Sequence, residues 1–295
     1  MPRIIDIIRR LFPNAHPNYL AAFDAGDALL QQFGITTPLR LAHFLAQTMH
    51  ETAGGTILFE DLTYTSATRL LQVFGVGNHS AAVRPGEVAT LLNNPQALAE
   101  RVYGLGNPRK SAELGNTAPG DGFRFRGGGL LQTTGGGNYR RLGERIGIDL
   151  HGHPMLIADP ANALLPALHE WDAGRLNEAA DRNDIRAITR AINGGYNGLP
   201  ERQALFERIW SIANDGAPLP AWQAADTDGD TGWLQQALND LGASPPLALD
   251  GRYGPATVAA VRWFQSTVGV PADGVAGEVT RAALRQRLAA THASG

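Results

Sequence analysis

A chain of 295 residues with 43% hydrophobic content is long enough for one large core and a smaller second domain, because domains cluster at roughly 100 to 200 residues. The formal net charge of -3 and the lack of any dense Lys/Arg stretch argue against a nucleic acid partner. Cysteine is absent, which excludes disulfides, a thiolate nucleophile and thiolate metal ligands. No segment has the run of about 18 apolar residues that a transmembrane helix needs.

The N-terminal stretch carries charged residues among its apolar ones, including Arg3 and Arg9. It therefore lacks the continuous apolar run of a secretory signal. Ile4, Ile8 and Phe12 fall on one helical face instead. We expect a protein made in the cytoplasm without a signal peptide and without stable membrane insertion, so that any action outside the cell needs a separate exit route.

Two carboxylates flank a glycine break in the first part of the chain. Thr37 and Pro38 have the pattern of an N-cap and a first helical turn, and they predict a helix that ends at the glycine pair 54–55. Glu51 would then lie in the last turn, where the helix dipole disfavours an anion and helps to keep a carboxyl group protonated. Glu60 lies beyond the glycines, on a loop or a short extended segment.

Apolar residues at helical spacing predict further helices before residue 215. They are expected at 18–33, 66–74, 95–103, 138–146, 160–171, 184–192 and 200–213. Ser66 and Asn94 are the expected N-caps of two of them. The segment 104–122 has no clear period. Residues 123–126 alternate like a strand, and the neighbouring glycines allow tight turns, so a small hairpin is expected over 120–137.

The segment 215–230 is rich in Pro, Ala, Gly and Asp and has the composition of a linker. Beyond it, Asp250-Gly251 and Asp273-Gly274 each precede an apolar helical run, and the two pairs are 273 − 250 = 23 residues apart. This spacing predicts a small domain built from a duplicated turn-helix unit. The predicted parts are a first domain over 1–215, a linker over 216–229 and a tail domain over 230–290.

Two patterns resemble metal sites only superficially. His43 and His50 could share a helical face, but the HETAG sequence beside them is not HExxH, the usual zinc-binding pattern. The acidic run 226–230 lacks the glycine and the terminal glutamate of a calcium-binding EF-hand loop, so a solvated linker is favoured. We therefore expect no metal and no cofactor.

Longer motifs allow a family comparison. The chain contains, in order, LAHFLAQTMHETAGG, FEDLTYT, GNTAPGDGFRFRGGGLLQTTGGGNY, DPANALLPALHEW and AINGGYNGLPER. With these motifs, residues 3–213 resemble the family 19 glycoside hydrolases, in the phage and bacterial branch that includes peptidoglycan-cleaving endolysins. The tail, 232–288, resembles the three-helix type of peptidoglycan-binding domain through WLQQALNDLG, LALDGRYGPATVAAVRWFQ and VPADGVAGEVTRAAL. The resemblance implies a mainly α fold: a lysozyme-like, bilobal helical catalytic domain with a small β-hairpin, followed by a small three-helix domain.

The resemblance also implies roles for single residues. Cleaving a glycosidic bond commonly requires one carboxylic acid to protonate the leaving oxygen and a second group to activate water. Carried over from the family, Glu51 is the general acid and Glu60 the base, with inversion at the anomeric carbon. Thr134 matches the family's water-positioning hydroxyl. The matching substrate-binding candidates are Gln132, Asn138 and Asn193.

The chain departs from the family pattern at several positions. Gly128 and Gly136 replace the usual arginines of two glycine-rich motifs, which changes local substrate contacts or the rigidity of the hairpin. Tyr196 and Asn197 stand where plant chitinases carry a glutamate, as in the bacterial branch. A plant-type charge network around the base is therefore not expected.

The resemblance implies a peptidoglycan hydrolase, an endolysin-like muramidase that cleaves β-1,4 glycosidic bonds of the cell wall and causes lysis. Chitin is the alternative substrate, and the tail favours peptidoglycan. A non-catalytic wall-binding or virion structural protein is a third alternative, against which both glutamates argue. The lack of a ligand cluster disfavours a zinc amidase. We expect a monomer that acts on glycan strands in the periplasm after a holin-like partner has permeabilised the membrane.

Overall fold

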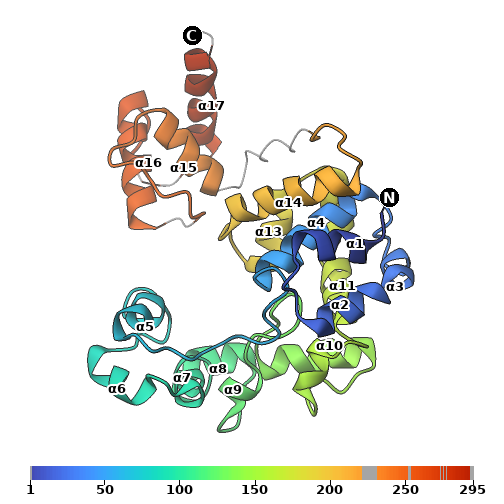
Figure 1. Cartoon of the computed structure of the whole chain (residues 1–295). Helices are drawn as coiled ribbons and strands as arrows, with labels where there is room; N and C mark the ends of the chain where they lie inside the picture. The colour runs from blue at the N-terminus through green and yellow to red at the C-terminus, as the bar shows by residue number, and fades with distance from the viewer. Residues whose placement is uncertain are drawn as a thin grey trace. The chain divides into compact units, whose positions relative to one another are not determined.

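The computed structural model describes residues 2–220, 231–251, 254–272, 274, 276 and 278–292. Nearly all regular structure within these residues is helical (Figure 1), which confirms the mainly α fold. The chain forms two compact units. The first consists of Met1–Glu178 and Glu201–Leu219, and the second of Ala179–Pro200 and Pro220–Gly295.

The predicted division into 1–215, 216–229 and 230–290 stays a prediction. Most of the expected linker, including the acidic run 226–230, lies outside the residues that the structure describes. In the described part of the chain, no helix is both long enough and apolar enough to cross a membrane.

Three short helices open the first unit, namely α1 (Ile4–Leu11), α2 (Pro17–Asp24) and α3 (Asp27–Gln32). All four isoleucines of α1 are buried, as the spacing of its apolar residues predicts. The single helix predicted over 18–33 is wrong, because the chain breaks at Ala25 and Gly26. A side chain at Gly26 would collide with Leu164, so the break lets the chain pass close beside a later helix.

The long helix α4 (Pro38–Glu51) carries the first predicted carboxylate at its last position. It begins as the sequence predicts, with the Thr37 hydroxyl accepting a hydrogen bond from Arg40 N at 3.2 Å and proline in the first turn. Every residue from 41 to 49 is buried. The helix therefore lies in the core of the first unit, and Glu51 is positioned by that core.

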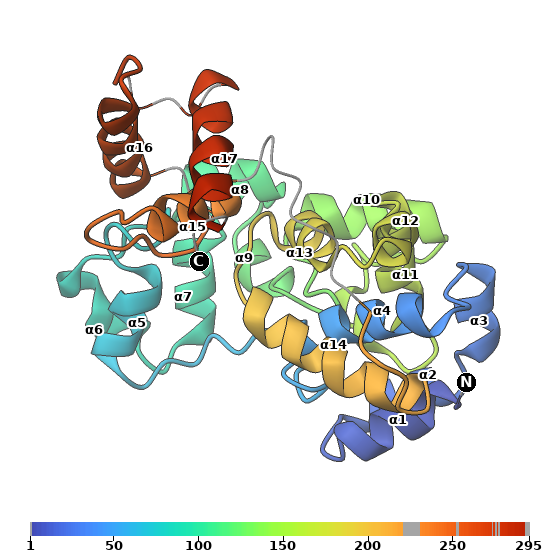
Figure 2. The same ribbon diagram turned by 90° about the horizontal axis from the view of Figure 1, so that it is seen from above.

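Two later helices pack against α4, namely α11 (Leu164–Ala173) and α14 (Leu199–Ala213). The Phe44 ring meets the Trp171 ring edge-on with centroids 5.4 Å apart, and the His43 ring lies 4.5 Å from the Phe206 ring. Figure 2 shows α4 between these two helices. Trp171 is fully buried and belongs to the core.

Residues 62–102 have a hydrophobic cluster of their own within the first unit. Its elements are α5 (Ala67–Phe74), the 3₁₀ turn η1 (Pro85–Glu87), α6 (Val88–Leu91) and α7 (Pro95–Val102). The side chains of Ser66 and Asn94 accept hydrogen bonds from Arg69 N and Ala97 N. Both predicted N-caps are therefore confirmed.

The four residues that alternate like a strand, 123–126, are not extended. The first two belong to the short helix α9 (Asp121–Arg124). The Asp121 carboxylate accepts hydrogen bonds from Thr117 N at 2.9 Å and Ala118 N at 2.8 Å, which closes a turn directly before this helix. The predicted strand is therefore wrong, because a local side-chain-to-backbone turn outweighs the apolar alternation.

The small hairpin lies a few residues further along the chain. Gly128 N donates to Thr133 O at 3.1 Å, and Thr133 N donates to Gly128 O at 2.9 Å. Gly128 also forms an antiparallel bridge with Phe59, and Glu60 N donates to Gly127 O at 2.8 Å. The expected hairpin is thus present in a shorter form, and it holds the segment that carries the second predicted carboxylate.

The other elements before the tail are α8 (Pro108–Leu114), α10 (Gly136–Ile146), the 3₁₀ helix η2 (Pro154–Ala158), α12 (Leu176–Asp181) and α13 (Ile185–Asn193). The apolar spacing predicts α10, α11, α13 and α14 to within a few residues. It misses α8, because the segment 104–122 has no helical period and the helix depends on the Asn107 side chain, which accepts from Lys110 N at 3.4 Å.

The tail contains three helices, α15 (Thr231–Asp240), α16 (Pro255–Val268) and α17 (Glu278–His292). They surround one apolar cluster whose fully buried members include Leu234, Leu238, Val261 and Leu284. The three-helix domain expected at the C-terminus is confirmed.

The duplicated turn-helix unit of the tail is visible in two matching sets of hydrogen bonds. In each set, a buried glutamine accepts from the N–H of a glycine with positive φ and donates to a buried threonine hydroxyl. The sets are Gln235, Gly251, Thr257 and Gln265, Gly274, Thr280. Asp273, which begins the second predicted Asp-Gly pair, lies outside the described residues.

Candidate active site

Glu51 is held by a buried arginine. Arg202, on α14, has a side chain that is 2% exposed, and its guanidinium donates to Glu51 Oε1. The same guanidinium donates to Gln47 Oε1 at 2.5 Å, one turn earlier on α4. A buried ion pair of this kind fixes the geometry of both partners, because either charge alone would be costly to bury. The Glu51 side chain is 20% exposed, so a substrate can reach it.

Glu60 has different surroundings. Its Oε1 accepts a hydrogen bond from the Tyr103 hydroxyl at 2.9 Å, and its backbone N–H is bound to Gly127 O. Burial raises the pKa of the Glu60 carboxyl, and the Tyr103 hydrogen bond, the Gly127 contact and the Arg126 charge partly offset that rise. A carboxylate with a raised pKa is a better proton acceptor, which suits a general base.

Three of the predicted site residues meet around Gly127. A Cβ atom added at Gly127 would lie 3.1 Å from Gln132 Oε1 and 3.4 Å from both Thr134 Oγ1 and Glu60 Cβ. A Cβ atom there would be tight against Gln132 and in contact with the other two, so a larger side chain would press on all three neighbours. The structure therefore brings Gln132 and Thr134, at the hairpin, close to Glu60 on the neighbouring segment.

The hairpin side chains are anchored to their own turn. Gln132 has a φ of +50°, an uncommon conformation for a residue other than glycine, and its Nε2 donates to Gly129 O at 2.8 Å. The Thr134 hydroxyl donates to Gln132 O at 3.0 Å. Its oxygen lone pairs can still accept a hydrogen bond from a water molecule near Glu60. This geometry is compatible with the water-positioning role that the sequence implies for Thr134.

Asn138 lies in the first turn of α10. Its Nδ2 donates to Thr134 O at 2.6 Å, and its Oδ1 accepts from Arg141 at 2.5 Å. The Asn138 amide nitrogen thus supports the hairpin and its oxygen binds a neighbour on α10, and a substrate contact for Asn138 stays a prediction. Asn193 belongs to the second unit, at the end of α13, where its Nδ2 donates to Asn197 O at 3.0 Å. Its predicted role in substrate binding likewise stays a prediction.

The two glycines that replace family arginines occupy crowded positions. A Cβ atom at Gly128 would collide with the Tyr139 hydroxyl and lie 2.8 Å from the Phe59 ring. At Gly136 it would lie 3.0 Å from the Phe125 ring. Aromatic rings therefore fill the space next to both glycines, and the hairpin of this chain is packed without arginine at either position.

Sequence reasoning misses several residues that contact the site. They are Arg202 and Gln47 beside Glu51, Tyr103 beside Glu60, and Thr133 and Glu170, whose side chains form a hydrogen bond of 2.6 Å. Gln47 has a sequence signal, because it precedes Glu51 by four residues on one helix and shares its face. The contacts of the other four depend on packing between distant segments.

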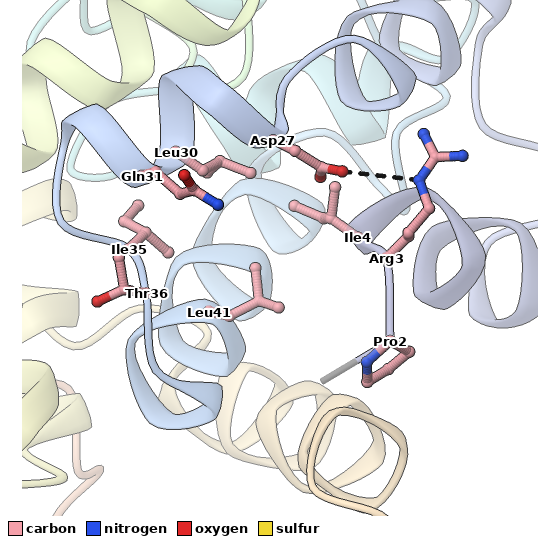
Figure 3. A pocket seen from close by; sticks show the side chains of 9 residues that line it. All are labelled: Pro2, Arg3, Ile4, Asp27, Leu30, Gln31, Ile35, Thr36 and Leu41. Carbon is pink, nitrogen blue, oxygen red and sulfur yellow. Dashed lines mark ion pairs between the residues drawn. The ribbon is translucent and has the colours of Figure 1, made fainter.

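A hollow of about 340 Å³ lies elsewhere in the first unit, between the N-terminal segment, α3 and the start of α4 (Figure 3). Its walls are largely aliphatic, and an ion pair of Arg3 with Asp27, 3.6 Å long, lies at its edge. None of the predicted site residues is among the residues that line it. Within the described part of the chain, no group of three or more His, Cys, Asp or Glu residues could hold a metal ion.

A helical core that positions one carboxylate at a helix end and a second beside a hairpin is compatible with glycoside hydrolysis, which commonly uses a pair of carboxyl groups. Comparison with curated proteins gives the family. A glycosyl hydrolase family 19 domain-containing protein of Haemophilus influenzae is 31% identical over 209 residues, which cover 70% of this chain and 94% of the relative. The chain belongs to glycosyl hydrolase family 19.

Solved structures of family 19 chitinases are similar over most of this chain. Chitinase C from Streptomyces griseus covers 75% of this chain and 98% of its own, at 18% identity and a TM-score of 0.46. A second bacterial family 19 chitinase covers 71% of this chain and 95% of its own, at 19% identity and the same TM-score of 0.46.

The tail has relatives of its own. Residues 227–284 match the family described as "Putative peptidoglycan binding domain". A zinc D-Ala-D-Ala carboxypeptidase of Streptomyces albus G is 42% identical over 64 residues, which cover 20% of this chain and 25% of that protein. The similarity to the carboxypeptidase is therefore limited to one module.

Proposed function

We propose that this glycoside hydrolase cleaves the β-1,4-linked glycan backbone of bacterial peptidoglycan. The observation that carries the choice of polymer is the match of residues 227–284 to a peptidoglycan-binding family. A module of this kind concentrates the enzyme on an insoluble polymer without any new contact at the cleavage site. Chitin, the other polymer of β-1,4-linked N-acetylhexosamine, is the second candidate substrate.

The proposed mechanism is a single inverting displacement. Glu51 donates its proton to the glycosidic oxygen as the bond to the anomeric carbon breaks, and Glu60 takes a proton from the attacking water, whose oxygen bonds to that carbon. The hydrogen-bonding capacity of Thr134 Oγ1, next to Glu60 across Gly127, supports its role in orienting this water. After product release, the proton on Glu60 leaves to solvent and Glu51 takes up a new one.

Substitution of the acid tests this function. We expect Glu51→Gln to lose roughly 10² to 10⁴-fold of the rate of reducing-end release from purified sacculi, because a general acid typically contributes that factor. The variant should still sediment with sacculi, since the tail is unchanged. Release of reducing ends by the variant at near the parent rate would contradict the assignment of Glu51.

The same assay separates the two polymers. Peptidoglycan as the substrate predicts faster reducing-end release from sacculi than from chitin oligomers at equal sugar concentration. The reverse order would favour a chitinase. Proton NMR of the first product formed from a soluble oligomer tests inversion, because an inverting enzyme releases the α-anomer from a β-linked substrate.

The route to the wall is a further part of the proposal. We propose that the protein acts as a monomer on the wall from the periplasmic side, after a holin-like partner has permeabilised the membrane, and so causes lysis. Expression alone should then leave cells intact, and a membrane-permeabilising agent should make them lyse. Prompt lysis without such an agent would contradict this route, and sedimentation of the purified protein tests the monomer.

A further inference from the structure

Glu170 is a carboxyl group that the proposed reaction does not use. It lies on α11, partly buried, beside Trp171, whose ring contacts Phe44 of α4. Glu170 Oε1 accepts a hydrogen bond from the Thr133 hydroxyl at 2.6 Å. This short distance is typical of a hydroxyl bound to a carboxylate. Glu170 therefore links the helix that packs on α4 to the hairpin.

Burial and nearby groups both affect the pKa of the Glu170 carboxyl. Burial raises the pKa of its carboxyl, the Thr133 hydrogen bond and the Arg145 charge lower it, and the Glu51 charge raises it. The Trp171 ring, beside Glu170 on α11, packs on Phe44 of α4, the helix that ends at Glu51. The hydrogen bond of Glu170 to Thr133 therefore ties the hairpin to the core that holds the proposed acid.

Thr133 connects several parts of the hairpin through its backbone. Its backbone exchanges two hydrogen bonds with Gly128, which bridges Phe59, the residue before Glu60. The next residue along the chain is Thr134, whose Oγ1 lies near Glu60 across Gly127. A shift of Thr133 would therefore move the proposed base and the proposed water-positioning hydroxyl together.

We propose that Glu170 is a positioning residue of the active site. By anchoring Thr133 to α11, it fixes the spacing between Glu51 on α4 and the hairpin that holds Glu60. An inverting reaction needs its two carboxyl groups about 6.5 to 9.5 Å apart, with a water between base and sugar. A misplacement of about 1 Å can cost roughly 10²-fold in rate. This inference rests on the proposed function.

Four variants test the role of Glu170. Thr133→Val keeps the shape of the side chain and removes the hydroxyl, and Glu170→Leu removes the acceptor. Each should lower kcat on sacculi by about tenfold to 100-fold and change KM by less than about threefold. The double variant should be no slower than the slower single variant, because both changes break one contact. Glu170→Gln keeps an oxygen acceptor for Thr133 and should recover most of kcat.

Controls show whether a lowered kcat comes from lost positioning or from a loss of folding. They also separate failure of this inference from failure of the proposed function. Glu113→Gln, at an exposed ion pair with Lys110, should leave kcat unchanged. Folding is checked by circular dichroism, and kcat is referred to folded protein. Thr133→Val that is folded and retains more than half of the parent kcat would overturn the inference. An active Glu51→Gln would instead overturn the proposed function.

An independent observation concerns the tail. A hollow of about 240 Å³ lies between the loop 243–248 and the first half of α16. Alanine, proline and leucine side chains form most of its walls, and Trp263, 40% exposed, lies at its edge. No charged side chain is among the described residues that line it. An exposed tryptophan beside small apolar side chains offers a flat surface at the edge of the hollow.

We infer that this hollow binds one N-acetylhexosamine ring of a glycan strand, with an apolar face of the sugar against Trp263. The described lining residues offer no charged partner for the carboxylates of the wall's stem peptides, which disfavours those peptides. The hollow is smaller than the roughly 300 to 1,000 Å³ of drug-sized pockets, so it suits one ring. This inference also rests on the proposed function.

Binding of the full chain to sacculi tests this subsite. With Glu51→Gln as the parent, Trp263→Ala should raise the dissociation constant in a sedimentation assay by about fivefold to tenfold. Val279→Ala, which truncates an apolar side chain that is 67% exposed on α17, should not. Soluble chitin oligomers should displace the parent, and D-alanyl-D-alanine peptides should not.

Two outcomes would overturn the inference. One is parent-like binding of the Trp263→Ala variant, with its fold verified by circular dichroism. The other is displacement by the peptides and not by the sugars. Failure of the parent itself to bind sacculi would instead contradict the wall-binding role of the tail in the proposed function.

Discussion

At the scale of single residues, the two proposed catalytic glutamates differ in their partners. Glu51 faces the buried Arg202 guanidinium, whereas Glu60 faces the Tyr103 hydroxyl and lies in a site where burial raises its pKa. Two carboxyl groups in unlike environments can take unlike roles in one reaction. The roles of acid and base proposed for the two groups follow the family pattern.

The hydrogen bond between Tyr103 and Glu60 predicts a change in pH dependence. This bond lowers the pKa of Glu60, so its loss in Tyr103→Phe should raise that pKa further. The base must be ionised, and activity falls as the pH drops through its pKa. The acidic limb of the kcat/KM profile should therefore move to higher pH. Tyr64→Phe, which removes another tyrosine hydroxyl of the first unit, is the control, and an unmoved limb in Tyr103→Phe would contradict the contact.

The buried pair of Arg202 and Glu51 predicts a change in stability. Arg202→Met leaves a partly buried carboxylate without its partner, and the free energy of unfolding should fall by about 3 kcal/mol. Urea denaturation measures it. Arg3→Met breaks a pair with Asp24 in which the side chains are 56% and 46% exposed, so it should cost less than about 1 kcal/mol. Equal effects of the two substitutions would show that burial of Arg202 does not matter.

The sequence predicts single site residues where the motif and the contact are local. Glu51 at a helix end follows from Thr37, Pro38 and the glycines after it. The partner of Glu51 is 151 residues away along the chain, so no local pattern identifies Arg202. Tyr103 and Glu170 likewise reach the site through packing of segments that the sequence does not show to be neighbours.

At the scale of elements, the sequence predicts the helices that have strong caps and clear apolar spacing. It does not predict the turns between them. The start of α4 follows from an N-cap and a proline, whereas the break at Gly26 depends on the approach of Leu164. The short helix α9 replaces a predicted strand because the Asp121 carboxylate closes a turn before it. Alternation over four residues was too weak a signal to outweigh that turn.

The junction at Gly127 predicts an effect of side-chain volume on catalysis. Gly127→Val would push Gln132, Thr134 and Glu60 apart, and kcat on sacculi should fall by about tenfold to 100-fold with the fold retained. Gly86→Val, where an added Cβ meets nothing within 4 Å, should leave kcat within about twofold. A Gly127→Val enzyme with parent kcat would show that the three side chains need not converge.

The repeated glutamines of the tail predict a local loss of stability. Gln235→Leu leaves the Gly251 N–H without its acceptor, which should destabilise the tail by about 1 to 3 kcal/mol. Faster hydrogen exchange in α15 and α16, with no change in the first unit, would show this. Gln236→Leu removes a bond to Asp240 on the exposed face of α15 and should change stability by less than about 0.5 kcal/mol.

At the scale of the whole molecule, a family 19 glycoside hydrolase is joined to a module related to peptidoglycan-binding domains. The motifs of both parts are readable from the sequence, because each spans a continuous stretch. The sequence does not show that Ala179–Pro200 belongs to the second compact unit, because this grouping depends on tertiary contacts.

Mass spectrometry of purified sacculi digested with the full chain tests the central claim most directly. The account predicts soluble fragments that carry new reducing sugar ends on intact stem peptides, formed by the parent and reduced by roughly 10² to 10⁴-fold with Glu51→Gln. Fragments cut within the stem peptides, or no soluble fragments from sacculi while chitin oligomers are hydrolysed, would contradict it.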